Sequence, residues 1–292
     1  MNTVSCYLMG GLGNQLFQIF ATLAYGMQNK RRIIFPYSKT SPGSVLRYTF
    51  WETFLKPLSI FTTLNTKSGV TNDQIFKYPR LSEHGHNFQS IPNVPQESIL
   101  LYGYYQSYRY FHEHYSTIVS LMRVDKQKED LLKTYNEIYF KDTQNKICSM
   151  HFRIGDYKAI QDCHPIMPYE YYDQALQELM DANIISRVLY FYQECDTDDV
   201  HEIVNTLQMK FKHLEFIGIN HNIEDWQQML LMSACDHNII ANSTFSWWGA
   251  YMNTNPNKMV LYPSVWFGPK LSDKKVDDLC PPEWIKINYI KN

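Results

Sequence analysis

The stretch that decides the fold is Cys148-Ser149-Met150-His151-Phe152-Arg153-Ile154-Gly155-Asp156-Tyr157, where an apolar run ends in a cation, an anion and a glycine. Residues 146–152 mix β-branched, aromatic and small side chains at strand length, which predicts a buried strand. Open α/β sheets bind ligands at the carboxyl ends of their strands, so a site is expected here. Arg153 suits a phosphate, because its planar fork donates two charge-assisted bonds to one anion. The residues alone leave a second reading open, a simple ion pair between Arg153 and Asp156 across the loop.

Strand and helix patterns alternate beyond this stretch, as they do in parallel α/β sheets. The predicted strands are 146–152, 187–193, 214–219, 237–241 and 259–263, and the predicted helices are 168–182, 197–209, 223–234 and 244–253. We therefore expect residues 146–292 to form a doubly wound, Rossmann-like nucleotide-binding domain.

The first half opens with a similar unit. Residues 4–9 read as a buried strand, Gly10–Gly13 as a tight turn, and residues 14–29 as a helix with apolar side chains at i, i+3, i+4 and i+7. Such a turn either presents backbone N–H groups to an anion or lets a helix pack closely on a strand. A dinucleotide site is not predicted, because Gly11-x-Gly13-x-x-Leu16 lacks the third glycine, and no G-x-x-x-x-G-K-[ST] loop occurs.

The rest of this half predicts strands at 32–37 and 99–105 and helices after Ser107 and at 125–139, whereas residues 38–96 show little periodicity. Polar residues 141–145 mark the expected boundary between a domain of residues 1–145 and one of 146–292. Insertions between sheet elements often carry recognition surfaces. The aromatic and histidine side chains of the insertion are therefore candidates for recognition contacts, although packing under a surface excursion is the favoured explanation for any single one of them: Tyr48, Trp51, Tyr78 and His84.

Asn242-Ser243-Thr244 follows the predicted strand 237–241 and opens the next predicted helix. Its hydroxyl and N–H groups stand where a helix amino terminus favours a phosphate. Plain N-capping by Ser, Thr or Asn is the other explanation, and both can hold together. Small residues beside Trp247 and Trp248 favour close helix packing, so we interpret the tryptophans as packing residues.

Composition excludes several classes of function. The 292 residues are 45% apolar and carry a formal charge of −2, which provides no basic field for nucleic acid. Six cysteines form no C-x-x-C pair, so we expect reduced thiols in a cytoplasmic protein. The amino terminus lacks a secretory pattern, and no run of eighteen apolar residues predicts a membrane span.

A metal is not expected either. Asp196-Thr197-Asp198 imitates a D-x-D metal-binding motif, but acids directly before a helix commonly cap it. The histidines show no spacing typical of a closed metal site.

Three motifs occur in order along the chain, and two shorter ones accompany them. They are Gly10-Gly11-Leu12-Gly13-Asn14-Gln15-Leu16-Phe17-Gln18, His151-x-Arg153-x-Gly155-Asp156-Tyr157, Asn242-Ser243-Thr244-Phe245-Ser246-Trp247-Trp248-Gly249-Ala250, Gly103-Tyr104-Tyr105-Gln106-Ser107 with Tyr110-Phe111, and residues 231–241. Together they resemble glycosyltransferase family 11. That family includes α-1,2-fucosyltransferases, which move L-fucose from GDP-fucose to a sugar hydroxyl with inversion. The resemblance implies a GT-B type fold, two Rossmann-like domains facing a cleft, with the first domain on the acceptor side.

The resemblance also implies roles for individual residues. Arg153 would stabilise the charge on the departing GDP without a metal, and Asp156 is the first candidate for the base, with the loop 161–164 second. The expected donor contacts are His151, Arg153, Asn14, Gln15, Asn242, Ser243, Thr244 and Ser246, and the expected acceptor contacts are Asp162 and His164. The expected acceptor position is the 2-hydroxyl of galactose in a glycan. Many relatives have a second arginine where this chain has Ile154. Another nucleotide-sugar transferase, or a degenerate nucleotide- or glycan-binding module, are the alternatives.

Overall fold

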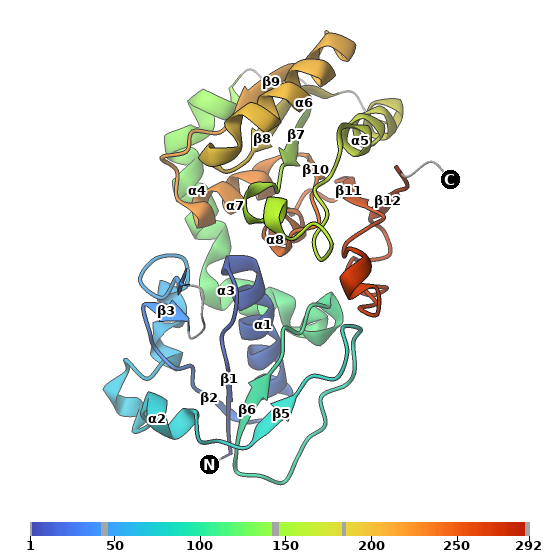
Figure 1. Ribbon diagram of the computed structural model, residues 1–292. Coiled ribbons are helices and arrows are strands. Elements are labelled where there is room, and N and C mark those ends of the chain that lie inside the picture. Colours follow the sequence, from blue (N-terminus) through green and yellow to red (C-terminus); the bar gives the residue numbers. More distant parts are fainter. Residues whose placement is uncertain (1, 42–45, 142–145, 183–184, 290–292) are drawn as a thin grey trace. The chain divides into compact units, whose positions relative to one another are not determined.

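The computed structural model describes residues 2–41, 46–141, 146–182 and 185–289, and the chain divides into two compact units (Figure 1). Unit 1 is Met1–Gln127 with Lys275–Pro281, and unit 2 is Lys128–Lys274 with Pro282–Asn292. This division, after Gln127, lies earlier in the chain than the boundary expected after residue 145. Residues 142–145, next to the expected boundary, lie outside the described part of the chain. A short segment near the carboxyl terminus also returns to unit 1.

Unit 2 contains the six-stranded parallel sheet that the strand and helix alternation predicts. Its strand order is β12-β11-β10-β7-β8-β9. The strands are β7 (Lys146–His151), β8 (Ile185–Phe191), β9 (Glu215–Gly218), β10 (His237–Ile239), β11 (Val260–Pro263) and β12 (Ile285–Ile287). The helices are α5 (Tyr169–Ala182), α6 (Thr197–Lys210), α7 (Asp225–Ala234) and α8 (Thr244–Tyr251). Every predicted element of this half is confirmed, and β12 is added at the edge.

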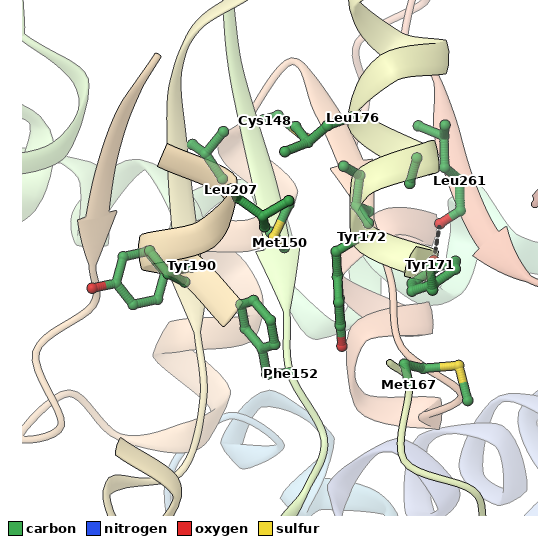
Figure 2. Packing of buried hydrophobic residues seen from close by; sticks show 14 of the residues in the cluster. Cys148, Met150, Phe152, Met167, Tyr171, Tyr172, Leu176, Tyr190, Leu207 and Leu261 are labelled. Atoms are coloured by element: carbon green, nitrogen blue, oxygen red, sulfur yellow. Dashed lines mark hydrogen bonds between the residues drawn. The ribbon is translucent and has the colours of Figure 1, made fainter. Parts of the chain in front are cut away.

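The core of unit 2 lies between the sheet and helices α5 and α6. Successive side chains of a strand point to opposite faces, so Cys148 and Met150 share one face of β7, and Phe152 directly after the strand belongs to the same core cluster. Figure 2 shows these three between Leu176 of α5 and Leu207 of α6, and all five are at most 1% exposed. Burying side chains of this size stabilises a fold by about 1.5–3 kcal/mol each.

Helices α7 and α8 pack on one another, and α8 contacts β10. Trp247 and Trp248 are fully buried in α8, and Trp247 stacks on Tyr251 with ring centroids 4.5 Å apart. The interpretation of the tryptophans as packing residues is confirmed.

Unit 1 has a smaller parallel sheet of order β2-β1-β6-β5. Its strands are β1 (Thr3–Cys6), β2 (Arg32–Ile33), β5 (Arg80–Ser82) and β6 (Ser98–Tyr102), with an antiparallel pair β3 (Thr40–Ser41) and β4 (Arg47–Tyr48) apart from it. Its helices are α1 (Leu12–Gln28), α2 (Asn72–Ile75) and α3 (Tyr115–Met122), and α4 (Val124–Tyr135) runs from unit 1 into unit 2. The predicted strand, turn and helix at the amino terminus are confirmed. The helix predicted at 125–139 is α4 followed by a π-helical turn, Asn136–Phe140.

No disulfide bond joins the cysteines among the described residues. Among the described residues, no helix combines the length and the apolar character that crossing a membrane requires.

Candidate active site

In unit 2, strands β8 and β9 extend the sheet on one side of β7, and strands β10, β11 and β12 extend it on the other. The order in which strands are added to the sheet therefore reverses between β7 and β10. Open α/β sheets bind ligands at the carboxyl ends of the strands at such a switch point. His151-x-Arg153 follows β7, and Asn242-Ser243-Thr244 follows β10. The two motifs meet, because the Tyr157 hydroxyl donates to the backbone oxygen of Asn242 at 3.2 Å.

Arg153 is held by three neighbours. Its Nη1 donates to Oε1 of Gln193 at 2.9 Å, and its Nη2 donates to Oδ1 of Asp156 at 2.5 Å. The guanidinium also lies 4.8 Å from the centre of the Tyr157 ring, a cation–π contact. The ion pair considered from the sequence is thus present. A guanidinium has about five N–H donors, so these two hydrogen bonds leave donors of Arg153 for an anion.

The loop after β7 is fixed by a carboxylate from the turn that follows the neighbouring strand, β8. Gly155 N–H donates to Oδ2 of Asp196 at 2.8 Å, and Asp196 is only 2% exposed. The sequence interpretation of Asp196 as a helix cap is wrong. It stands at the N-cap position of α6, but its side chain makes no capping bond and turns to Gly155 instead. Neither Gln193 nor Asp196 is a site residue by sequence reasoning, because their contact with the Arg153 loop depends on the pairing of β8 with β7.

His151 is buried, and its Nδ1 has no hydrogen-bond partner among the described residues. Burial, assisted by the positive charge of Arg153, lowers the pKa of His151 to about 3. The imidazole is therefore neutral at pH 7. It can offer one donor and one acceptor to a ligand without adding to the charge of Arg153.

The β10 motif combines capping with one unsatisfied atom. The Ser243 hydroxyl accepts from Phe245 N–H at 3.3 Å, so the predicted N-cap of α8 is confirmed. Nδ2 of Asn242 donates to the backbone oxygens of Pro165 and Trp266 at 2.9 and 3.1 Å. Its Oδ1 is buried without a partner in the described part of the chain.

The two remaining donor-contact candidates of this motif differ in exposure. The Ser246 hydroxyl is buried and donates back to Ser243 O at 3.3 Å, whereas Thr244 is partly exposed in the first turn of α8. Ser246 therefore serves the helix, and Thr244 stands nearer to solvent.

The two acceptor-contact candidates, His164 and Asp162, have different partners and different exposure. His164 stacks on Tyr157 with ring centroids 4.9 Å apart, and burial lowers the pKa of His164. Asp162 is exposed and pairs with Lys270 at 3.0 Å. His164 therefore joins the Arg153 group through Tyr157, whereas Asp162 faces the loop that carries Lys270.

Unit 1 holds the other two candidates, Asn14 and Gln15. Asn14 is partly exposed, and its Oδ1 accepts from Nε2 of Gln106 at 2.9 Å. Gln15 is fully buried and donates to the backbone oxygens of Gly10 and Tyr48 at 3.0 and 2.9 Å. Gln15 thus fixes the glycine turn and strand β4, while Asn14 stands at the surface of the turn.

A search for a metal centre covers the residues that the structure describes. Within them, no group of three or more His, Cys, Asp and Glu side chains is arranged to hold an ion. Asp196 is committed to Gly155, and Asp198 is exposed.

A family model described as glycosyl transferase family 11 matches residues 2–288. The chain belongs to glycosyltransferase family 11. It is 30% identical to the O-antigen biosynthesis glycosyltransferase WbnK of Escherichia coli over 64% of this chain and 60% of that protein. It is also 25% identical to an alpha-1,2-colitosyltransferase of Escherichia coli over 98% of this chain and 99% of that protein. The match thus spans less than two thirds of WbnK and nearly all of the colitosyltransferase.

The fold of this family 11 chain is also similar to that of a solved structure. The crystal structure of POFUT1 in complex with GDP-fucose superimposes with a TM-score of 0.53 at 11% identity, over 89% of this chain and 97% of that one. Together with the two parallel sheets, this similarity gives the fold class as α/β of the GT-B type, as predicted.

Ile154, where many relatives are expected to carry an arginine, is 3% exposed and belongs to the core of unit 2. An apolar side chain is well suited to this environment, since an unpaired charge there would be costly. The departure at Ile154 therefore leaves the contacts of Arg153 intact.

Proposed function

We propose that this chain is an inverting glycosyltransferase that moves L-fucose from GDP-fucose to a glycan acceptor, with the 2-hydroxyl of galactose as the acceptor position. The observation that carries the proposal is Arg153, held at the switch point of unit 2 in a chain of family 11. Its guanidinium is pre-organised by Gln193 and Asp156, which reduces the entropy lost when an anion binds.

The reaction would be a single displacement. The acceptor oxygen forms a bond to the anomeric carbon of fucose as the bond from that carbon to the diphosphate oxygen breaks, which inverts the centre. Arg153 offsets the charge that develops on GDP, and the first turn of α8 adds partial positive charge. The buried Nδ1 of His151 and Oδ1 of Asn242 suit polar atoms of the nucleotide.

Asp156 is the proposed base for the acceptor proton. Its carboxylate pairs with Arg153 at 2.5 Å, so it would take the proton from within an ion pair. A donor diphosphate that draws Arg153 towards itself would weaken this pair and leave the carboxylate oxygens open to the acceptor proton. We further propose that no divalent metal takes part, since Arg153 and the N–H groups of α8 supply the positive charge.

A second donor deserves the same test, because the relative that matches nearly the whole chain is a colitosyltransferase. The decisive experiment is a transfer assay with a galactose-terminated acceptor and GDP-fucose, GDP-colitose, GDP-mannose and UDP-sugars, each with and without EDTA. We expect transfer from GDP-fucose that EDTA does not change. Preference for another sugar nucleotide would overturn the donor assignment, and loss of activity with EDTA would overturn the metal-free mechanism.

Thermal shifts with GDP test the binding step by itself. A ligand at 100 times its Kd stabilises by about 2.7 kcal/mol, which raises Tm by roughly 5–10 °C. Arg153→Ala should remove most of this shift, and Arg153→Lys should restore part of it because it keeps the charge but loses the fork. Lys158→Ala is the matched control, since Lys158 is an exposed cation of the same loop that pairs with Asp199. An equal loss in Lys158→Ala would mean that only net charge matters. GDP binding without any transfer would favour the binding-module alternative.

A further inference from the structure

Three neighbouring strands of unit 1, β1, β6 and β5, end side by side, and a carboxylate joins two of these ends. Glu83 directly follows β5, and its Oε2 accepts from the N–H groups of Tyr104 and Tyr105 at 2.8 and 2.9 Å. Both donors lie in the turn that follows β6. One carboxylate oxygen therefore holds two successive N–H groups of a neighbouring strand's turn.

This turn has a backbone conformation that needs such support. Tyr105 has φ +53°, a left-handed value that costs a residue with a side chain roughly 1–2 kcal/mol. Its ring is buried, and its hydroxyl donates to Leu81 O at 3.1 Å. Gly103 is matched to Glu83 as well, because a Cβ on Gly103 would stand 2.3 Å from Cβ of Glu83.

The conformation of Tyr105 determines where the next two residues point. Nε2 of Gln106 donates to Oδ1 of Asn14 at 2.9 Å, and the Ser107 hydroxyl donates to Asp278 O at 2.8 Å. Gln106 therefore reaches the residue that follows the glycine turn of β1. Its bond fixes which end of the Asn14 amide is the oxygen and which is the amino group.

We propose that Glu83 is a positioning residue for the reaction, holding the turn at Tyr104 and Tyr105 so that Gln106 orients the Asn14 amide. The importance of Asn14 for transfer rests on the proposed function. The hydrogen-bond chain itself, from Glu83 through the turn to Gln106 and Asn14, does not.

A carboxylate in this place could instead act as a base, and the contacts argue against that role. Oε2 already accepts two N–H groups, and Oε1 lies 3.5 Å from the Tyr110 hydroxyl. Burial raises the pKa of Glu83, which the two N–H groups oppose, so the site also tolerates an uncharged acceptor. The amide oxygen of glutamine could accept the same two bonds, whereas leucine could accept neither.

Glu83→Gln and Glu83→Leu therefore separate the two roles. We expect kcat/KM for transfer from GDP-fucose to fall at least about tenfold in Glu83→Leu and to stay within about twofold of wild type in Glu83→Gln. Gln106→Leu should cause a loss similar to that of Glu83→Leu, and combining them should add little. Glu113→Leu, which removes an exposed carboxylate of the same unit, is the matched control and should have no effect.

Hydrogen exchange of the peptide covering residues 102–107 supplies a readout that needs no activity. Its exchange should be faster in Glu83→Leu and unchanged in Glu83→Gln and Glu113→Leu. Equal exchange in all variants would overturn the inference, even if wild type transferred no sugar and the proposed function failed. A Glu83→Gln enzyme as inactive as Glu83→Leu would overturn it too, in favour of a base. If Glu83→Leu does not fold, wild-type activity in Gln106→Leu would refute the proposal.

Discussion

Gly155→Ala tests whether the loop after β7 holds Arg153 in place. Gly155 has φ +30°, and a Cβ there would stand 2.2 Å from Oε1 of Gln193. The left-handed backbone costs alanine roughly 1–2 kcal/mol. Gln193 is exposed and would swing away, which removes its bond to Arg153 and about 1 kcal/mol more. Reduced freedom of the unfolded chain returns about 0.4–1 kcal/mol. We expect a net loss of about 1–2.6 kcal/mol, or roughly 2–10 °C in Tm.

The same substitution should weaken GDP binding, because Arg153 loses one of the contacts that fix its guanidinium. Ordering a side chain of this kind costs about 0.5–1.5 kcal/mol, so the Kd for GDP should rise about two- to twelvefold. Gly85→Ala is the matched control: it has φ +82° but only Gln89 nearby, at 3.9 Å. Calorimetric Tm and GDP titrations on both variants decide the matter. If Gly155→Ala loses no more stability than Gly85→Ala and binds GDP as wild type does, the reasoning about Gln193 is refuted.

Three further substitutions in unit 2 give separate outcomes. Asp196→Ala leaves Gly155 N–H without its acceptor and should lower the free energy of unfolding by about 1–3 kcal/mol, with no change on adding EDTA; an equal loss caused by EDTA in wild type would instead indicate a metal. His151 is neutral when folded, with a pKa near 3 against 6.5 unfolded, so stability is lost as pH falls from about 6.5 towards 3, by at most about 1.4 kcal/mol per pH unit. In His151→Phe, the free energy of unfolding measured with urea should depend less on pH over that window, and an unchanged pH dependence would contradict the burial of His151. Tyr171→Phe removes the hydroxyl that donates to Ile240 O and Leu261 O at 2.5 and 3.2 Å; it should cost about 1–2 kcal/mol without changing the Kd for GDP, and a changed Kd would contradict a purely structural role.

The second half of the chain could be predicted closely because its local patterns agree with its tertiary structure. Buried parallel strands are continuous apolar runs, and the helices between them carry apolar side chains at helical spacing. Strand β12 could not be predicted, because Ile285–Ile287 is short and becomes a strand only by pairing with β11. The structure of the insertion at 38–96 could not be predicted either, because its sequence has no regular apolar spacing. Its order depends on side-chain bonds to distant backbone groups, such as Nδ2 of Asn72 to Tyr37 O at 2.7 Å.

The candidate site divides in the same way. Arg153 and Asp156 are three residues apart, so their pairing could be considered from the sequence alone. Gln193 and Asp196 follow β8 and contact the same loop, and only the register that pairs His151 with Phe191 brings them there. The role of Glu83 could not be predicted, because its partners Tyr104 and Tyr105 follow the neighbouring strand and lie twenty-one and twenty-two residues away in sequence. A carboxylate that binds backbone N–H groups has no sequence pattern of its own.

Both units place a hydrogen bond at the point where their strand order switches. In unit 1 it joins Gln106, after β6, to Asn14, after β1, across 92 residues of sequence; in unit 2 it joins Tyr157, after β7, to Asn242, after β10, across 85. The side chains of Gln106, Asn14 and Tyr157 are therefore constrained by these bonds as well as by any ligand, whereas Asn242 takes part through its backbone oxygen. Residues that share such a bond show interaction energies of roughly 0.5–3 kcal/mol. The loss caused by changing Asn14 alone thus includes the misplacement of Gln106, and only the double substitution of Asn14 and Gln106 separates that part from any direct contact with the donor.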